Sequence, residues 1–330
     1  MSHKNLSNLS LIITVYNSEQ TIIRALESIK VLIEIGAQVI IVNDASTDSG
    51  PLLINNWDLR GCIKLISNPE NQGSANSRNL GLQNADRDWV IFLDSDDELM
   101  SENVIEILSA ADKETELIVA GLDAFDVTTS RKIYSNVPPI KFSSQVEAKR
   151  WILAHRGYWR IIYKRTFLLQ GDLIFFPEKR HLAGKFFNMD DYFFLLTVLA
   201  KSKHEIKASV NATYRYYTSL QDRKKYTAQC ENFFIGYRLL VDRLSLSESI
   251  DLDNRHLAIN NATSQYIQCI VELRGLKTIS EIPRFVKDTK RAGISNSETI
   301  ENVYKIFRDF LRVNFGFRTH LRKILYLIRH

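Results

Sequence analysis

The chain has 330 residues, of which 45% are hydrophobic and 25% are charged. This is the composition of an ordinary water-soluble globular protein with a large core, and the length suffices for about two domains. The net charge of +5 arises within residues 301–330, which contain seven basic and two acidic residues. The whole chain has 43 basic and 38 acidic residues, so residues 1–300 contain 36 of each and are formally neutral.

Cysteine usage and hydropathy exclude several classes of protein. Cys62, Cys230 and Cys269 lie far apart and in no metal-ligand spacing, so neither a disulfide framework nor a zinc site is expected. The first apolar run, Leu9–Val15, is too short for a signal sequence or a membrane span, and no later run reaches spanning length. We therefore expect a protein of the reducing cytoplasm.

The first hundred residues alternate short apolar runs with helical patterns, which predicts a mainly parallel α/β sheet. The predicted strands are Leu9–Val15, Val39–Val42, Ile63–Ser67 and Trp89–Leu93, and the predicted helices are Glu19–Ile33, Leu52–Trp57 and Ala75–Gln83. Polar residues follow each strand. Because open α/β sheets bind ligands beyond the carboxyl ends of their strands, we expect the functional site there.

After Met100 the pattern changes. The predicted elements are a helix, a strand at Leu117–Gly121, a hairpin over Phe125–Val137, helices at Gln145–His155 and Asp190–Leu199, and a last strand at Ala212–Tyr217. Beyond about Leu220, glycine and proline become rare and helical spacing dominates. We therefore expect a first domain over residues 1–220 and a helical C-terminal domain over 221–330.

Asp94-Ser95-Asp96-Asp97 directly follows the strand Trp89–Leu93. Carboxylates at i and i+2 after a strand project to the same side, as a hard cation such as Mg²⁺ or Mn²⁺ requires. A cation bound by one or two carboxylates keeps positions open for the oxygens of a diphosphate. The alternative is a helix cap, but Ser101-Glu102 supplies one of its own, so the metal interpretation is favoured.

Asp190 and Asp191 open a predicted helix about a hundred residues later. Acidic residues are favourable at a helix N-terminus, and a carboxylate near a hydroxyl is also a competent general base. The residues alone leave both roles open.

Weaker signals lie at two other strand ends. Asp44 either accepts hydrogen bonds from a base or ribose or caps the following turn. Gly73 in Asn71-Gln72-Gly73 lets backbone approach a ligand closely, and Arg78 one turn into the next helix could reach a phosphate, although an ordinary turn and cap would look the same. Trp159 and Arg160 either stack on a sugar or lie in the core.

The order of these pieces resembles family 2 glycosyltransferases of the GT-A fold. The resemblance covers about residues 9–218 and rests on Thr14-Val15-Tyr16-Asn17, Val42–Asp48, Asn71-Gln72-Gly73 with Ser77–Gly81, Phe92–Asp97 and Asp190-Asp191. It implies inverting transfer of a sugar from a nucleotide diphosphate sugar, most often a UDP-sugar, to an acceptor hydroxyl of a bacterial surface polysaccharide or lipid-linked glycan.

The resemblance also implies roles for single residues. The donor-binding set would be Thr14, Tyr16, Asn17, Asp44, Asn71, Gly73, Arg78, Asp94, Ser95 and Asp96. Asp96 and Asp94 would hold Mn²⁺ or Mg²⁺. Asp191 matches the second acid of the family's Glu-Asp pair and would be the base. Asp190 stands where glutamate is usual, which leaves open which carboxylate acts. The segment Tyr214–Ser219 resembles a late family motif, but Arg215 is displaced and has no assigned role.

Residues 301–330 repeat apolar positions at helical spacing with basic residues between them. Such a helix either lies on the anionic inner face of the cell membrane or packs on its own domain or another subunit, so a homo-oligomer stays open. Three other functions compete: a nucleotidyltransferase, although the Gly-rich, Lys-containing loop of that class is missing; a non-catalytic sugar-nucleotide-binding module; and a nucleic-acid binder, which the interleaved charges do not favour.

Overall fold

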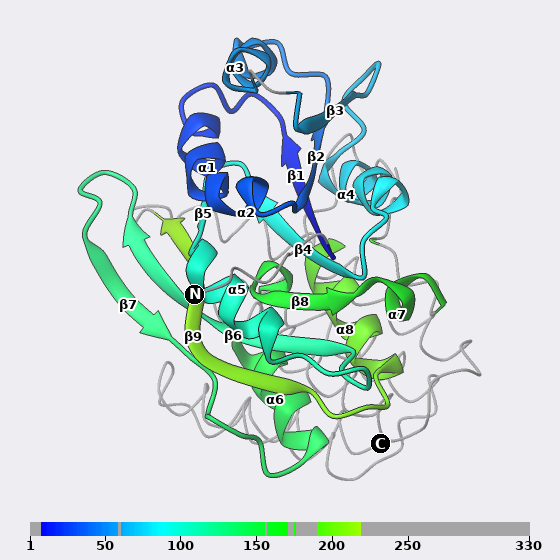
Figure 1. The fold of residues 1–330 in the computed structure, drawn as a ribbon. Coiled ribbons are helices and arrows are strands. Elements are labelled where there is room, and N and C mark those ends of the chain that lie inside the picture. Colours follow the sequence, from blue (N-terminus) through cyan, green and yellow to red (C-terminus); the bar gives the residue numbers. More distant parts are fainter. Residues whose placement is uncertain (1–7, 59–60, 156, 171–174, 176–189, 219–330) are drawn as a thin grey trace, which may run out of the picture. The chain divides into compact units, whose positions relative to one another are not determined.

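The sheet is built around strand β1 (Leu9–Val15), which is almost entirely buried and pairs in parallel with β2 (Gln38–Asn43) and β4 (Trp89–Asp94). The computed structural model describes residues 8–58, 61–155, 157–170, 175 and 190–218. Strand β3 (Ile63–Ser67) pairs in parallel with β2 and completes this half of the sheet (Figure 1). The hydrophobic run of β1 follows from burial on both faces, as in other parallel sheets.

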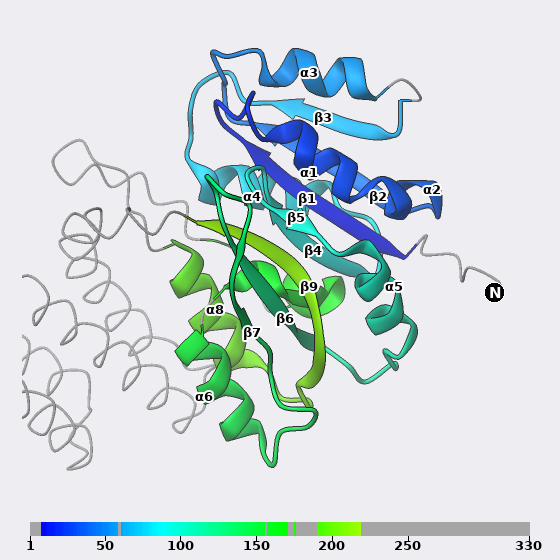
Figure 2. The ribbon, with the colours of Figure 1, turned by 90° about the vertical axis from the view of Figure 1, so that its left-hand side faces the viewer.

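The other half of the sheet is mixed. Strand β8 (Ile161–Lys164) lies antiparallel between β4 and β6 (Leu117–Asp126), and β9 (Lys207–Thr218) runs parallel to β6. Strand β7 (Lys132–Asn136) forms a hairpin with β6, and β6, β7 and β9 lie side by side in both views (Figures 1 and 2). The strand order is β3-β2-β1-β4-β8-β6-β9-β5.

The last strand of this order, β5 (Glu98–Leu99), requires the sheet to curl. It is antiparallel to β9, four strand positions from β4 in the pairing order, or about 19 Å in a flat sheet at about 4.8 Å a step. Only residues 95–97 connect β4 to β5, and four residue steps span at most about 14 Å. The sheet must therefore bend so that β9 approaches the end of β4, where the acidic loop lies.

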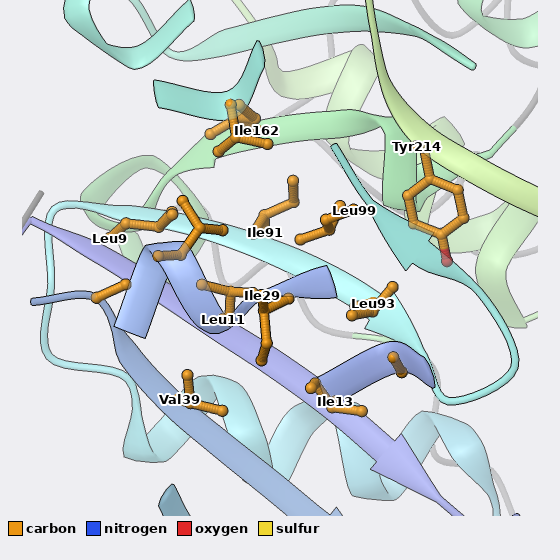
Figure 3. Packing of buried hydrophobic residues seen from close by; sticks show 14 of the residues in the cluster. Leu9, Leu11, Ile13, Ile29, Val39, Ile91, Leu93, Leu99, Ile162 and Tyr214 are labelled. Carbon is orange, nitrogen blue, oxygen red and sulfur yellow. The ribbon is translucent and has the colours of Figure 1, made fainter. Parts of the chain in front are cut away.

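Helices cover both faces of the sheet. They are α1 (Ile22–Ser28), α2 (Lys30–Glu34), α3 (Gly50–Trp57), α4 (Ser74–Asn84), α5 (Ser101–Ser109), α6 (Gln145–His155), α7 (Arg165–Gln170) and α8 (Asp190–Lys201), with the 3-10 turn η1 (Tyr158–Arg160). Figure 3 shows one core, in which Leu11 and Ile13 of β1 pack with Ile29, Ile91 and Leu93.

A second core lies on the opposite face of β4. The ring of Phe92 makes edge-on contacts with those of Tyr158, Tyr163 and Phe175, and Phe194 of α8 stacks on Phe175 with ring centroids 3.9 Å apart. Alternation along the strand sends Phe92 to this face while Ile91 and Leu93 enter the other core. This aromatic core fixes η1 and α8 beside the end of β4.

The predicted mainly parallel α/β architecture is confirmed, but the single helix predicted over Glu19–Ile33 is wrong. It divides at Ile29 (φ −105°, ψ 1°). The reason lies in Ser28, whose hydroxyl donates to the carbonyl of Ala25 and accepts the amide of Leu99 in β5, since serine bonds of this kind bend helices. Strands β5 and β8 were not predicted, and β6 and β9 extend further than predicted.

Two predictions concern segments beyond this unit. The helical C-terminal domain over 221–330 and its basic tail lie outside the described residues. In the part of the chain that the structure describes, none of the helices has the length and apolar character needed to cross a bilayer.

Candidate functional site

Asp44 organises the first part of the site, at the ends of β1 and β2. Its amide donates to the carbonyl of Val15, and its side chain is 3% exposed. The carboxylate accepts hydrogen bonds from Asn68 Nδ2 (2.7 Å), the Gln72 amide (2.9 Å) and the Gly73 amide (2.8 Å). Asp44 thus holds the Asn71–Gly73 loop in place, a role that was not predicted from sequence; its role toward a base or ribose stays a prediction.

That loop leads into α4. Gly73 precedes the helix with φ 88° and ψ 158°, a conformation that only glycine adopts easily, and its amide also donates to Asn71 Oδ1 at 3.1 Å. Arg78 follows one turn into α4 and is 9% exposed. The helix therefore brings an arginine to the edge of the sheet at which Asp44 and Asn71 lie.

Thr14, Tyr16 and Asn17 lie at the end of β1. The strand register places Thr14 between Val42 and Asp94, and Tyr16 is 50% exposed. Asn17 has φ 51° and accepts hydrogen bonds from the amide (2.8 Å) and the hydroxyl (3.3 Å) of Thr47. The three residues predicted to hold a nucleoside thus share one edge with Asp44 and Asp94.

Asp94 ends β4 and is held by three side chains. Its Oδ1 accepts a hydrogen bond from the hydroxyl of Tyr158 (2.7 Å) and lies 3.2 Å from Arg78 Nη2, and its amide donates to Tyr214 Oη at 3.1 Å. The Arg78 guanidinium also lies over the rings of Tyr158 (4.6 Å) and Phe175 (5.3 Å). Asp94 and Arg78, predicted to act on the same ligand, are therefore in contact.

Asp94 and the next three residues form the acidic loop, defined as Asp94–Asp97. Ser95 is buried and shares a hydrogen bond with the Ser18 hydroxyl (2.7 Å), whereas Asp96 is exposed. The pKa of Asp96 is raised, first by nearby protein that displaces water and second by the charge of Asp94. Burial, then the charges of Asp96 and Asp94, raise the pKa of the buried Asp97 to about 9.

These charges fit a divalent cation that takes further ligands from a substrate. Asp94 and Asp96 raise the local negative charge, and a cation between them would relieve it. Within the described residues, no group of three or more His, Cys, Asp or Glu side chains could hold a metal ion.

Asp190 and Asp191 open α8, as predicted. Helix α8 packs against η1, and the charge of Asp191 acts on Tyr158 of that turn. The pKa of the Tyr158 hydroxyl is raised well above its usual value, mostly by burial and further by the charges of Asp94 and Asp191. Asp191 is thus in electrostatic reach of the Asp94 network; the side chain of Asp190 lies outside the described residues.

Two residues that contact Asp94 were not predicted from sequence: Tyr158 and Tyr214. The late aromatic segment Tyr214–Ser219 was the one available signal, and in Figure 3 the Tyr214 ring lies beside Leu93 and Leu99. For Trp159 and Arg160, the structure shows packing contacts. Trp159 stacks on Tyr214 at 4.1 Å between centroids, and the fully buried Arg160 donates to the Ala120 carbonyl (2.9 Å).

Parallel strands with an acidic loop after β4, extended by a mixed half-sheet, define the GT-A class of fold. Residues 10–171 match the model of glycosyl transferase family 2. The chain belongs to this family.

Curated relatives match more than half of the chain. The putative glycosyltransferase EpsH of Bacillus subtilis (strain 168) is 28% identical over 197 residues, covering 58% of this chain and 57% of that protein. The succinoglycan biosynthesis protein ExoO of Rhizobium meliloti (strain 1021) is 27% identical over 203 residues, covering 58% and 56%. This chain therefore matches little more than half the length of these relatives.

Solved structures share the fold at low sequence identity. Residues 1–349 of TarS from S. aureus, solved in complex with UDP-GlcNAc, align with a TM-score of 0.61 at 18% identity, covering 91% of this chain and 82% of that one. The mannosyltransferase PcManGT from Pyrobaculum calidifontis, solved with GDP-Man and Mn²⁺, aligns with a TM-score of 0.54 at 15% identity, covering 97% and 85%.

Proposed function

We propose that this protein is a metal-assisted, inverting glycosyltransferase that moves a sugar from a nucleotide diphosphate sugar, most often a UDP-sugar, to an acceptor hydroxyl. The observation that carries the proposal is the convergence of Asp44, Arg78, Asp94 and Asp96 at one edge of the sheet in a family 2 chain. We assign catalysis to residues 1–220 and propose a second domain, of helical character, over residues 221–330.

The nucleoside would lie across the ends of β1 and β2. Thr14, Tyr16, Asn17 and Asp44 offer hydroxyl, amide and carboxylate groups there, and the Asn71–Gly73 loop brings backbone close to a ligand. The carboxylate of Asp44 has lone pairs beyond the three hydrogen bonds that it accepts, so it can also take a donor from a base. UDP is the expected nucleotide because the TarS neighbour was solved with UDP-GlcNAc.

The diphosphate would lie beside Arg78 and the acidic loop. Asp96 and Asp94 would hold Mn²⁺ or Mg²⁺, the first of which is present in the PcManGT complex. Bound there, the ion would offset negative charge on the departing diphosphate. Asp94 Oδ1 already accepts bonds from Tyr158 and Arg78, which orients the carboxylate before a ligand arrives. Ser95, tied to Ser18, keeps the loop between the two carboxylates in place.

Asp191 is the proposed general base, with Asp190 as the alternative. The base takes the proton of the acceptor hydroxyl while that oxygen forms a bond to C1 of the sugar, and the bond from C1 to the diphosphate oxygen breaks. Attack opposite the leaving group inverts the anomeric centre. The support for Asp191 is that its charge acts on Tyr158, whose hydroxyl donates to Asp94.

The acceptor is proposed to be a growing surface polysaccharide or lipid-linked glycan of a bacterium. The support is the relationship to ExoO, a succinoglycan biosynthesis protein, and to the teichoic acid poly(glycerol phosphate) polymerase of Staphylococcus epidermidis, which is 33% identical over 138 residues, covering 41% of this chain and 19% of that protein. Such acceptors favour action at the inner face of the cell membrane.

The test is a screen for nucleotide release with Mn²⁺ or Mg²⁺ across UDP-sugars and GDP-mannose, on wild type, Asp96→Ala, Asp191→Asn and Asp190→Asn. Loss of a general base costs about 10²–10⁴-fold in rate, so Asp191→Asn should nearly abolish turnover. Asp96→Ala should remove the metal dependence. Asp86→Ala is the matched control, because its exposed carboxylate pairs with Arg87 at the opposite end of β4.

Four results would count against the proposal or one of its parts. Release of pyrophosphate would indicate a nucleotidyltransferase. If the protein binds the donor without turnover, and Asp191→Asn binds it equally well, the protein would be a binding module. Full activity of Asp191→Asn with loss in Asp190→Asn would move the base to Asp190. Retention of the donor's anomeric configuration in the product, read by NMR, would contradict inversion.

A further inference from the structure

The acidic loop is tied down at almost every residue. The Asp97 amide donates to the Asp94 carbonyl (3.1 Å), the Ser95 hydroxyl bonds that of Ser18 (2.7 Å), and Asp97 Oδ1 accepts the Tyr217 amide (2.8 Å). The exposed residue of the loop, Asp96, is held through its main chain, because its carbonyl oxygen accepts a hydrogen bond from Arg24 Nη2 of α1. Arg24 thus fixes the backbone that carries the Asp96 carboxylate.

Arg24 is itself fixed from two directions. Its guanidinium lies over the ring of Tyr217 at 3.8 Å, and its Nε is 3.4 Å from Glu98 Oε1. Glu98 is 9% exposed and also accepts the Tyr217 hydroxyl (2.7 Å) and Arg215 Nη1 (3.0 Å). A stacked, ion-paired guanidinium loses little further freedom when it bonds a carbonyl, so this contact is preorganised.

We propose that Arg24 is a positioning residue that sets the orientation of Asp96 for the donor's divalent cation. The inference rests on the proposed function, because it assigns Asp96 to the metal. Residues that contact a metal-coordinating side chain commonly affect metal affinity strongly, because they fix the orientation of that side chain before the ion binds. Arg24 does this from α1, across 72 residues of sequence, and its own side chain contacts the Asp96 carbonyl oxygen.

The substitution Arg24→Lys distinguishes the effect of the guanidinium's shape from the effect of its positive charge. Arg24→Lys keeps the positive charge near Asp96 but loses the planar fork that contacts Glu98, Tyr217 and Asp96 together. Arg24→Gln removes the charge as well. Tyr217→Leu leaves Arg24 intact and removes the ring beneath it, so it gives a second route to the same loss of position.

The experiment is calorimetric titration of the full chain with UDP at graded Mn²⁺ concentrations, with GDP in place of UDP where UDP does not bind. Loss of an outer-shell contact typically weakens metal binding about 10-fold or more, so Arg24→Lys and Tyr217→Leu should raise the half-saturating Mn²⁺ concentration about tenfold. At saturating Mn²⁺ the UDP affinity should return to that of wild type. A melting temperature close to wild type excludes general unfolding.

Arg87→Lys is the matched control, since Arg87 pairs with Asp86 (3.0 Å) at the far end of β4 and should leave the Mn²⁺ requirement unchanged. A wild-type Mn²⁺ requirement in Arg24→Lys and Tyr217→Leu would overturn the inference, and so would a defect confined to Arg24→Gln, which would assign the effect to charge. If wild type binds neither nucleotide in a metal-dependent way, the proposed function fails, and this inference fails with it.

Discussion

A side chain in this site can contribute to stability, to ligand binding or to both, and Tyr158 offers a way to measure the two contributions separately. Its buried hydroxyl donates to Asp94 Oδ1 at 2.7 Å, and the equally buried Tyr163 donates at the same distance to the carbonyl of Tyr158. The two tyrosines therefore differ in whether the acceptor is the proposed metal carboxylate or a neutral backbone oxygen.

Tyr158→Phe should reduce both stability and donor binding. A hydrogen bond to a charged group contributes about 1.5–3 kcal/mol, and without it the Asp94 carboxylate keeps Arg78 but loses part of its orientation. Tyr163→Phe should cost about 1 kcal/mol and leave UDP binding unchanged. Urea denaturation and UDP titration with Mn²⁺ measure both quantities. Equal UDP affinities in the two variants would show that the Tyr158 hydroxyl does not orient a ligand-binding carboxylate.

The sequence predicts those site residues whose signal is local. Asp44 and the acidic loop stand at the ends of β2 and β4, and Asn71–Gly73 follows β3 after three residues, so their place at the sheet edge follows from periodicity. Arg24, Tyr158 and Tyr214 contact the acidic loop from 72, 64 and 120 residues away. Nothing in their immediate sequence marks these contacts, because they depend on how the sheet curls. The ligand roles of all these residues remain predictions.

At the scale of elements, the local pattern predicts most of the helices and strands but misses those features that depend on tertiary contacts. The runs of β1 and β3 match their observed bounds, and in β1 the nearly continuous apolar, buried run leaves few alternatives. The break at Ile29 and the two-residue β5 escape prediction for a single reason: the Ser28 hydroxyl joins α1 to β5, and neither element signals the other in sequence. Tertiary contacts override local propensity there.

The packing of α4 on β1 gives a prediction for a whole element. A Cβ at Gly81 would lie 2.3 Å from Ile12 Cγ2, well inside contact distance and against a rigid, branched side chain in a buried strand. Gly81→Ala should therefore push α4 away from the sheet and cost about 1–3 kcal/mol despite alanine's higher helix propensity. Because α4 carries Arg78 and follows the Asn71–Gly73 loop, donor binding should weaken too.

Chemical denaturation of Gly81→Ala and Gln83→Ala tests this packing. Gln83 lies on the exposed side of the same helix, so its replacement by alanine should change stability by no more than about 0.5 kcal/mol. Stability of Gly81→Ala at or above that of wild type would mean that α4 does not approach β1 as closely as these distances require.

At the scale of the whole molecule, charge is divided unevenly. The net charge of +5 belongs to residues 301–330, whereas residues 1–300 are neutral. Apolar residues at helical spacing, such as Val303, Ile306, Phe307 and Phe310, accompany the basic ones. Two environments satisfy this pattern: an anionic membrane surface, or an apolar face on this chain or another copy.

Removing residues 301–330 distinguishes these environments. Near an anionic surface each basic residue contributes about 1 kcal/mol, so seven of them would dominate binding to phosphatidylglycerol vesicles and make it sensitive to salt. We therefore expect the full chain to sediment with such vesicles at low salt, and the chain ending at residue 300 to stay in solution. Neutral phosphatidylcholine vesicles are the control, since they lack the surface charge.

Unchanged vesicle binding after the deletion would exclude the membrane role for this segment. In that case the apolar positions must be buried against protein, and the deletion should lower the melting temperature or, if the partner is a second copy, reduce the mass measured by light scattering. If vesicle binding is lost while mass and melting temperature stay constant, the segment acts on the membrane alone. That result would place a lipid-linked acceptor within reach of the domain that carries Asp96 and Asp191.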